Sequence, residues 1–139
     1  QKAAYTGVIP QLLNSIEDGV APTVNGDGSQ AYDFISVADA ARANVAALRS
    51  TVTDEFYNVG TGVQTSIREL CNLILELRNS DLKVEYLPYS NDDARRLVQN
   101  RIGSTEKAER DLGFRYQDSL REGLVDLIEW RRRASSGAP

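Results

Sequence analysis

Histidine and methionine are both absent from this sequence of 139 residues. Without histidine the chain cannot form a serine–histidine triad, a histidine general base or the usual zinc-hydrolase site. The single cysteine, Cys71, has no thiol partner, which excludes a disulfide framework and a four-cysteine metal site. No apolar run approaches the roughly 20 residues that span a bilayer, and the N-terminus lacks a signal-peptide pattern. We therefore expect no membrane association, a buried structural thiol and a reducing, cytoplasmic setting.

The formal net charge of -4 argues against binding a polyanion such as nucleic acid through bulk charge, although a local group of arginines can still hold one phosphate. Hydrophobic residues make up 41% and charged residues 26%, the proportions of a globular domain, and the length suits one compact core. Because the chain opens at Gln1 and has no initiator methionine, we expect it to be a piece of a longer protein.

The first half of the chain predicts alternating helices and strands. Apolar residues at helical spacing predict a helix over residues 8–16, and the glycine-rich turn at 25–28 precedes a strand-like run over 32–35. Asp39 is expected to open an alanine-rich helix that runs through Leu48. The aromatic and β-branched run at 55–59 predicts a buried strand.

Two capping boxes, Ser66 with Glu69 and Ser119 with Glu122, predict helix starts in the second half. Residues 83–86 alternate like a strand, 95–102 can form strand or loop, and 104–112 suit a helix closed by Gly113. We predict one mixed α/β unit over residues 1–133 and a disordered tail over 134–139.

Short motifs follow one another in a definite order along the chain. They are Val8-Ile9-Pro10, Gly26-Asp27-Gly28-Ser29-Gln30, Asp33-Phe34-Ile35-Ser36-Val37-Ala38-Asp39, Tyr57-Asn58-Val59-Gly60-Thr61-Gly62, Thr65-Ser66-Ile67, Lys107-Ala108, Leu112-Gly113-Phe114 and Leu120-Arg121-Glu122-Gly123-Leu124. In this order they resemble the C-terminal, substrate-binding part of extended short-chain dehydrogenases/reductases, the NAD-dependent epimerase/dehydratase family. The ending is similar to that family too, with a Lys-Ala helix, a Leu-Gly-aromatic stop and a final helix.

The resemblance implies an α/β fold of mixed helices and short strands, the Rossmann half being missing. It also implies a substrate-binding half that binds a nucleoside diphosphate sugar, while the absent N-terminal domain holds NAD and a catalytic Tyr-x-x-x-Lys pair. No tyrosine here has a lysine four residues later, and no G-x-G-x-x-G motif is present, so we expect no activity from this chain alone. There are two alternatives. The chain is a catalytically silent binding or protein-interaction module, or it is a scaffold without a ligand. The sugar, the base and the reaction are not identified by the sequence.

Four residues are implied by the resemblance to line the pocket of the nucleotide base. They are Val8 and Ile9 at the start of the first helix, and Val24 and Asn25 before the glycine turn. Apolar walls with backbone polar groups suit a flat ring. The alternative is that Val8, Ile9 and Val24 are ordinary core residues.

Three further residues are implied to face the diphosphate. Tyr32 stands where the family has an arginine, so it offers one neutral hydrogen bond or a stacking ring, or is a plain strand aromatic. Asn58 can donate its amide to a phosphate or cap a turn. Arg101 is favoured over Arg95 and Arg96 as the phosphate-binding arginine, with surface solvation as the alternative.

Asp27, Asp33 and Asp39 recur along the chain, and we interpret them as turn and cap residues and not as a carboxylate cluster. We interpret Asp92-Asp93 as an exposed loop pair and Arg131 to Arg133 as a solvated helix end without a site. If the Rossmann sheet is missing, the run at 56–59 and the apolar face of the helix at 39–48 are exposed, which predicts self-association as a dimer.

Overall fold

The computed structural model describes residues 7–89 and 100–137, and these form two compact units. Unit 1 comprises residues 1–31 and 65–100, and unit 2 comprises 32–64 and 101–139. The chain passes between them three times: within β2 (Ala31–Tyr32), just before β3 (Thr65–Ser66) and within β5 (Asn100–Arg101).

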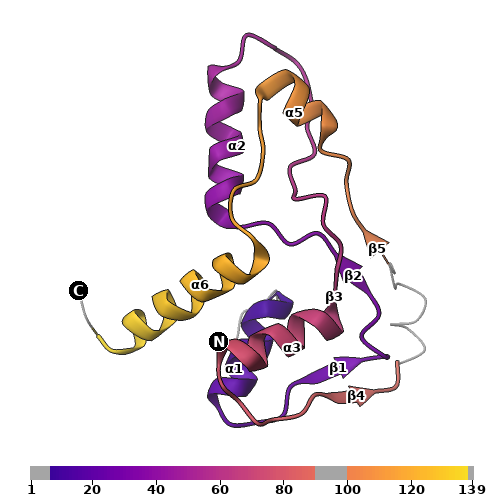
Figure 1. Cartoon of the computed structure of the whole chain (residues 1–139), viewed down its shortest axis with the longest axis vertical. Coiled ribbons are helices and arrows are strands. Elements are labelled where there is room, and N and C mark those ends of the chain that lie inside the picture. The colour runs from indigo at the N-terminus through magenta and orange to yellow at the C-terminus, as the bar shows by residue number, and fades with distance from the viewer. Residues whose placement is uncertain (1–6, 90–99, 138–139) are drawn as a thin grey trace. The chain divides into compact units, whose positions relative to one another are not determined.

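Unit 1 consists of two helices beside a short parallel pair of strands (Figure 1). Its elements are α1 (Val8–Glu17), β1 (Thr23–Asn25), β3 (Thr65–Ser66), α3 (Ile67–Leu77) and β4 (Glu85–Leu87). α1 lies against α3, and β1 pairs with β4 so that Asn25 is opposite Leu87. The middle residue of β1 is buried and its two neighbours are exposed. The core is formed by Leu12, Leu13, Ile16, Val24, Ile67, Leu70, Cys71, Ile74 and Leu75.

The helices of unit 1 begin and end where the sequence predicts. Pro10 lies in the first turn of α1, where a missing amide hydrogen costs nothing, and Gly19 follows its end with φ +70°. Ser66 and Glu69 form the predicted capping box of α3, the Ser66 hydroxyl accepting from the Glu69 amide at 3.1 Å.

Unit 2 contains α2 (Val37–Arg49), α5 (Glu106–Leu112) and α6 (Leu120–Ser135), and α2 lies against α5 (Figure 1). The capping box predicted at Ser119 and Glu122 is confirmed at the start of α6, and Gly113 ends α5 with φ +64°. A small cluster of Ala43, Ala108 and Phe114 forms the packed centre between α2 and the end of α5.

Two predictions about unit 2 are wrong in detail. Asp39 does not open its helix, because Ser36 is the N-cap residue and accepts the Asp39 amide at 3.0 Å. Residues 55–59 form no strand within the described part of the chain, where that segment has no ladder partner. The segment is bound instead by Lys107, which forms an ion pair with Glu55 and donates a hydrogen bond to the Phe56 carbonyl at 3.1 Å.

Other boundaries move by a few residues. The strand expected at 32–35 is confined to β2, and the one at 83–86 appears as β4 at 85–87. α6 continues through Ser135, two residues into the predicted tail. Arg95, Arg96, Asp92 and Asp93 lie outside the described residues.

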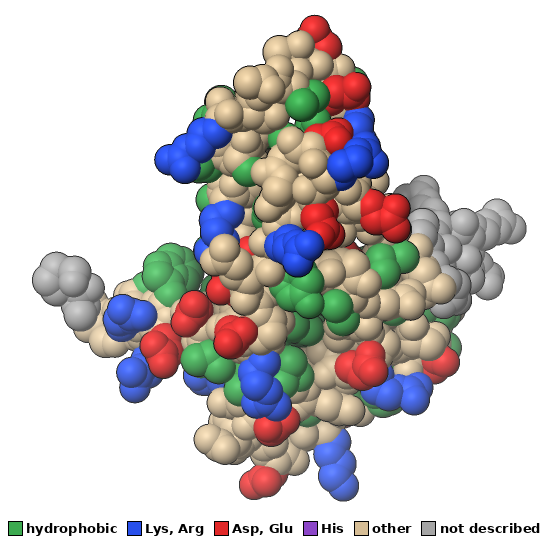
Figure 2. Space-filling model, turned by 45° about the horizontal axis from the view of Figure 1, so that its top comes forward, with side chains coloured by type: hydrophobic (Ala, Val, Ile, Leu, Met, Phe, Trp, Pro, Cys, Tyr) green, Lys and Arg blue, Asp and Glu red, His purple; other side chains and the backbone are tan. Residues whose placement is uncertain are grey.

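Apolar side chains are exposed along residues 37–63 of unit 2, as expected if a covering surface is missing. Leu48 is 86% exposed and Phe56 is 92% exposed, whereas a core residue such as Val24 is 5% exposed. Hydrophobic side chains are visible among charged ones at the surface drawn in Figure 2. In the described residues no helix combines the length and the apolar character that crossing a membrane requires.

Candidate functional site

A polar cavity of about 400 Å³ lies in unit 2. It brings together two residues that the sequence singled out, Asn58 and Arg101, which are 43 positions apart in the chain. The remaining wall is formed by Asp33, Val59, Gly60, Ile102 and Gly103.

Arg101 supplies the positive charge of this cavity. It is the second residue of β5, and its side chain is exposed and forms no ion pair or hydrogen bond with any other described residue. A guanidinium carries five donors in a planar fork and stays charged at any physiological pH. An arginine in a polar cavity, without a side-chain partner in the described part of the chain, is suited to two oxygens of a phosphate group.

Asn58 is exposed on the same cavity and faces Gly103 closely. A β-carbon at position 103 would lie 3.3 Å from Asn58 Cβ, so a side chain there would require the asparagine to shift by a few tenths of an ångström. The amide of Asn58 adds a neutral donor to the same cavity. The cavity therefore offers an anion one charged and one neutral donor group.

Tyr32 does not line this cavity. Its ring is half-buried and lies against Phe34, with centroids 6.0 Å apart and planes inclined at 58°. This tilted contact is a favourable aromatic pair, which matches the alternative interpretation of Tyr32 as a strand aromatic.

A second cavity, of about 670 Å³, lies in unit 1 beside the turn that follows β1. The Arg68 guanidinium donates to the Asp27 carbonyl from Nε at 3.2 Å and lies over the Tyr86 ring, 5.7 Å from its centroid. Gly26, at φ +78°, is covered by the Tyr89 ring, which any β-carbon would overlap. Aromatic walls around a few polar groups are typical of a site for a flat ring.

The four residues predicted for the base pocket take different places in unit 1. Val24 is a core residue, and Asn25 is exposed next to the second cavity, with its carbonyl accepting from Gln30 Nε2 at 3.1 Å. Val8 and Ile9 are half-buried in the first turn of α1. None of the four lines the cavity.

The sequence predicted no site role for Arg68, Tyr86 and Tyr89 of the second cavity, or for Gly60 and Gly103 of the first. The glycines carried a usable signal, since two of them flank the segments that hold Asn58 and Arg101. The parallel pairing of β1 with β4 brings residues 86–89 to the turn at 26–29. No local sequence pattern predicts this pairing.

The three aspartates have separate structural tasks, and only Asp27 is the turn residue that the sequence predicted. Asp27 accepts the Ser29 amide at 2.9 Å within its turn, and Asp33 accepts three donors from residues 61–62. Among the described residues no group of histidine, cysteine, aspartate and glutamate could hold a metal ion.

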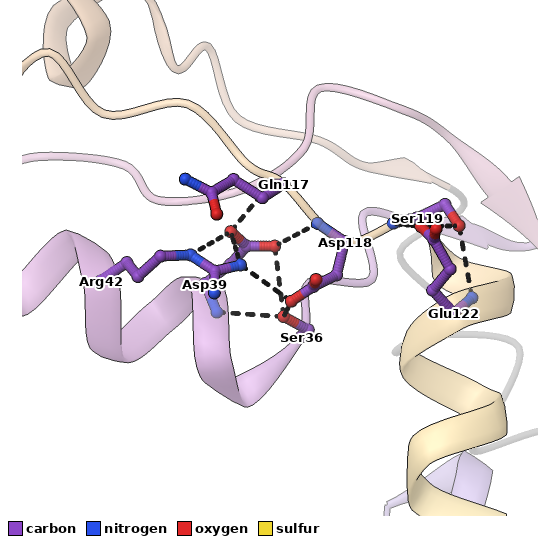
Figure 3. A network of polar contacts seen from close by, with 7 residues as sticks. All are labelled: Ser36, Asp39, Arg42, Gln117, Asp118, Ser119 and Glu122. Atoms are coloured by element: carbon purple, nitrogen blue, oxygen red, sulfur yellow. Dashed lines mark hydrogen bonds and ion pairs between the residues drawn. The ribbon is translucent and has the colours of Figure 1, made fainter.

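Asp39 is the buried centre of the polar network in unit 2 (Figure 3). Its carboxylate accepts from Arg42 Nη2 at 2.6 Å, from the Gln117 amide at 2.9 Å and from the Asp118 amide at 3.1 Å. Burial alone raises the pKa of Asp39, but the hydrogen bonds from Arg42, Asp118, Gln117 and Ser36 outweigh it and hold that pKa below 3.8. The network ties the start of α2 to the turn before α6.

Comparisons with known proteins identify the chain's relatives. Residues 1–60 match the model of the NAD dependent epimerase/dehydratase family. The chain is 31% identical over 130 residues to a UDP-N-acetyl-alpha-D-glucosaminuronate decarboxylase of Bacillus cytotoxicus, and the alignment covers 92% of this chain and 40% of the relative. It is 33% identical over 129 residues to a UDP-glucose 4-epimerase of Mycolicibacterium smegmatis, covering 93% of this chain and 40% of that one.

The fold is likewise similar to a solved UDP-glucose 4-epimerase from Thermotoga maritima, crystallised with UDP-glucose. The TM-score is 0.86 at 29% identity, and the alignment covers 97% of this chain and 42% of the other. The chain thus spans about 40% of the length of the curated relatives it matches. Sequence motifs, mixed α/β architecture and relatives agree, and the chain belongs to the NAD-dependent epimerase/dehydratase family of extended short-chain dehydrogenases/reductases.

Proposed function

We propose that this chain binds the nucleoside diphosphate sugar in an NAD-dependent epimerase or dehydratase. The observation that carries the proposal is the polar cavity of unit 2, which is lined by an arginine without a side-chain partner among the described residues and by an asparagine. The diphosphate is the anion we assign to Arg101 and Asn58, because a guanidinium fork matches two phosphate oxygens. The solved relative from Thermotoga maritima contains UDP-glucose, which supports this class of ligand.

In this proposal the residues of this chain bind and orient the nucleoside diphosphate sugar. The activity of the whole protein also needs an acid–base pair and NAD. No tyrosine of the sequence is followed four residues later by lysine, so the family's acid–base pair is not supplied here. When bound, NAD supplies the hydride chemistry of this family. The glycine turn after β1 is not suited to binding NAD. It continues into β2 and not into a helix whose N-terminus could bind a pyrophosphate.

Isothermal titration calorimetry of the chain with uridine, thymidine, guanosine and cytidine diphosphate sugars tests the proposal, with NAD as the comparison ligand. We expect saturable binding of one of these sugars. Arg101→Ala should weaken that binding about tenfold or more, since a hydrogen bond to a charged group contributes about 1.5–3 kcal/mol. Arg132→Ala, which removes an exposed arginine near the end of α6, should bind like the wild type. Equal affinities of all three proteins would contradict the assignment of Arg101.

A second candidate function is a protein-interaction module, and the exposed apolar side chains of unit 2 favour it. Val37, Leu48 and Phe56 are each more than four-fifths exposed, and such side chains lower their free energy by association. We propose that the chain dimerises through this surface. Light scattering should show a mass that rises with concentration, and Phe56→Ser together with Leu48→Ser should abolish the rise. A strictly monomeric wild-type chain at high concentration refutes the dimer.

The compartment we propose is a reducing cytoplasm, because Cys71 is a free, buried thiol and no other cysteine exists to pair with it.

A further inference from the structure

Asp33 connects the two segments that carry Asn58 and Arg101. Its carboxylate accepts from the Thr61 amide at 2.9 Å and 3.0 Å, from Thr61 Oγ1 at 2.6 Å and from the Gly62 amide at 2.9 Å. Its own amide donates to the Arg101 carbonyl at 3.1 Å. One residue thus holds the loop after Asn58 with its side chain and the strand of Arg101 with its backbone.

The carboxylate of Asp33 lines the cavity, where a free negative charge would repel an anion. Here both oxygens accept from donors of residues 61–62, so the lone pairs of the carboxylate are committed to that loop and not to a ligand. Gly60 permits this close approach, because a β-carbon there would overlap Asp33 Oδ2. The contact between Asp33 and this loop therefore depends on the lack of a side chain at Gly60.

From these contacts we propose that Asp33 is a positioning residue for anion binding: it fixes Asn58 and Arg101 so that both donate to one phosphate group. This inference rests on the proposed function, because it refines the site assigned to the diphosphate. Asp33 itself does not contact the anion. Loss of its carboxylate leaves the backbone bond to Arg101 but releases the loop after Asn58, and a loosely held pair of donors binds more weakly than a preorganised one.

The test is an NMR titration with inorganic pyrophosphate, followed through the side-chain amide of Asn58 and the Nε–H of Arg101. Three proteins are compared: the wild type, Asp33→Asn, and the matched control Asp126→Asn, which removes an exposed carboxylate of α6. In the wild type and the control both signals should shift and saturate. In Asp33→Asn, with its far-UV circular dichroism unchanged, the dissociation constant should rise about tenfold or more, as losses of supporting residues typically do.

A second variant keeps the proposal falsifiable if Asp33→Asn does not fold. Thr61→Val removes the hydroxyl donor that approaches Asp33 at 2.6 Å but leaves both backbone donors, and it should weaken pyrophosphate binding by a smaller factor. Wild-type affinity in a folded Asp33→Asn, or in Thr61→Val where only that variant folds, overturns the proposal. So does the lack of any response to pyrophosphate in the wild type. That last result is distinguishable from failure of the proposed function, which the calorimetric titration with nucleoside diphosphate sugars decides independently.

Discussion

Replacing Asp39 by asparagine removes the one buried negative charge around which α2 and the turn before α6 are organised. Oδ1 of Asp39 accepts from Arg42 Nη2 at 2.6 Å and from the Gln117 amide at 2.9 Å, while Oδ2 accepts from the Asp118 amide at 3.1 Å. In the variant one of these oxygens becomes an NH₂ group that faces donors instead of accepting from them. At least one backbone amide then loses its acceptor, and the ion pair with Arg42 is lost.

The magnitude follows from these contacts. An unsatisfied buried donor costs about 1–3 kcal/mol, and breaking a buried ion pair costs about 3–5 kcal/mol. Because Arg42 is partly exposed and keeps its contact with Asp118 at 2.8 Å, we expect the lower end, a loss of about 2–3 kcal/mol in the free energy of unfolding. Against a typical total of roughly 5–15 kcal/mol this is a large fraction.

Urea unfolding at pH 7, followed by far-UV circular dichroism and by the fluorescence of Trp130, measures the loss, with Asp126→Asn as the control. The folded-state pKa of Asp39 is lowered, so its contribution is present above pH 3.8 and declines as the pH falls through the folded-state pKa. The wild type should therefore converge on the variant in acid. Equal urea midpoints of Asp39→Asn and the control at pH 7 would refute the reasoning.

Three further predictions concern single side chains. Burial raises the pKa of the Cys71 thiol to about 11, so it should resist a thiol reagent at pH 8 until the protein is unfolded, and rapid labelling of the native chain would contradict its burial. Gly60→Ala should lower the free energy of unfolding by about 1–3 kcal/mol in urea titrations, because its β-carbon overlaps Asp33 Oδ2. Gly123→Ala in α6 should instead raise it by about 0.5–1 kcal/mol, since the nearest atom to that β-carbon is Ser36 Cβ at 3.6 Å; a loss there would show that the helix packs differently.

Local chemistry explains which elements were predictable. The two capping boxes, the proline in the first turn of α1 and the glycine that ends α5 act within one helical turn, so their effects can be worked out from neighbouring residues. The burial of Cys71 follows from helical periodicity in the same way.

The run at 55–59 shows where local reasoning stops. Its residues favour a strand, but a strand needs a neighbour to accept and donate its backbone hydrogen bonds. Within the described chain that neighbour is absent, and Lys107, packed over the Tyr57 ring at 4.9 Å, holds the segment instead. The helix start at Ser36 was misplaced although its signal is local, because Ser36 lies three residues before Asp39 and accepts the amide of that residue.

The sequence by itself determined the family, the helix ends and the candidate pair Asn58 and Arg101. The order of motifs, the capping residues and the chemistry of each side chain can all be read directly from the sequence. Tertiary structure alone decided that Asn58 and Arg101 share one wall with Asp33, that Tyr32 packs on Phe34, and that Val24 belongs to the core. These outcomes depend on hydrogen bonds and packing between residues far apart in the chain, such as the one from the Gly62 amide to Asp33, and no local pattern specifies them.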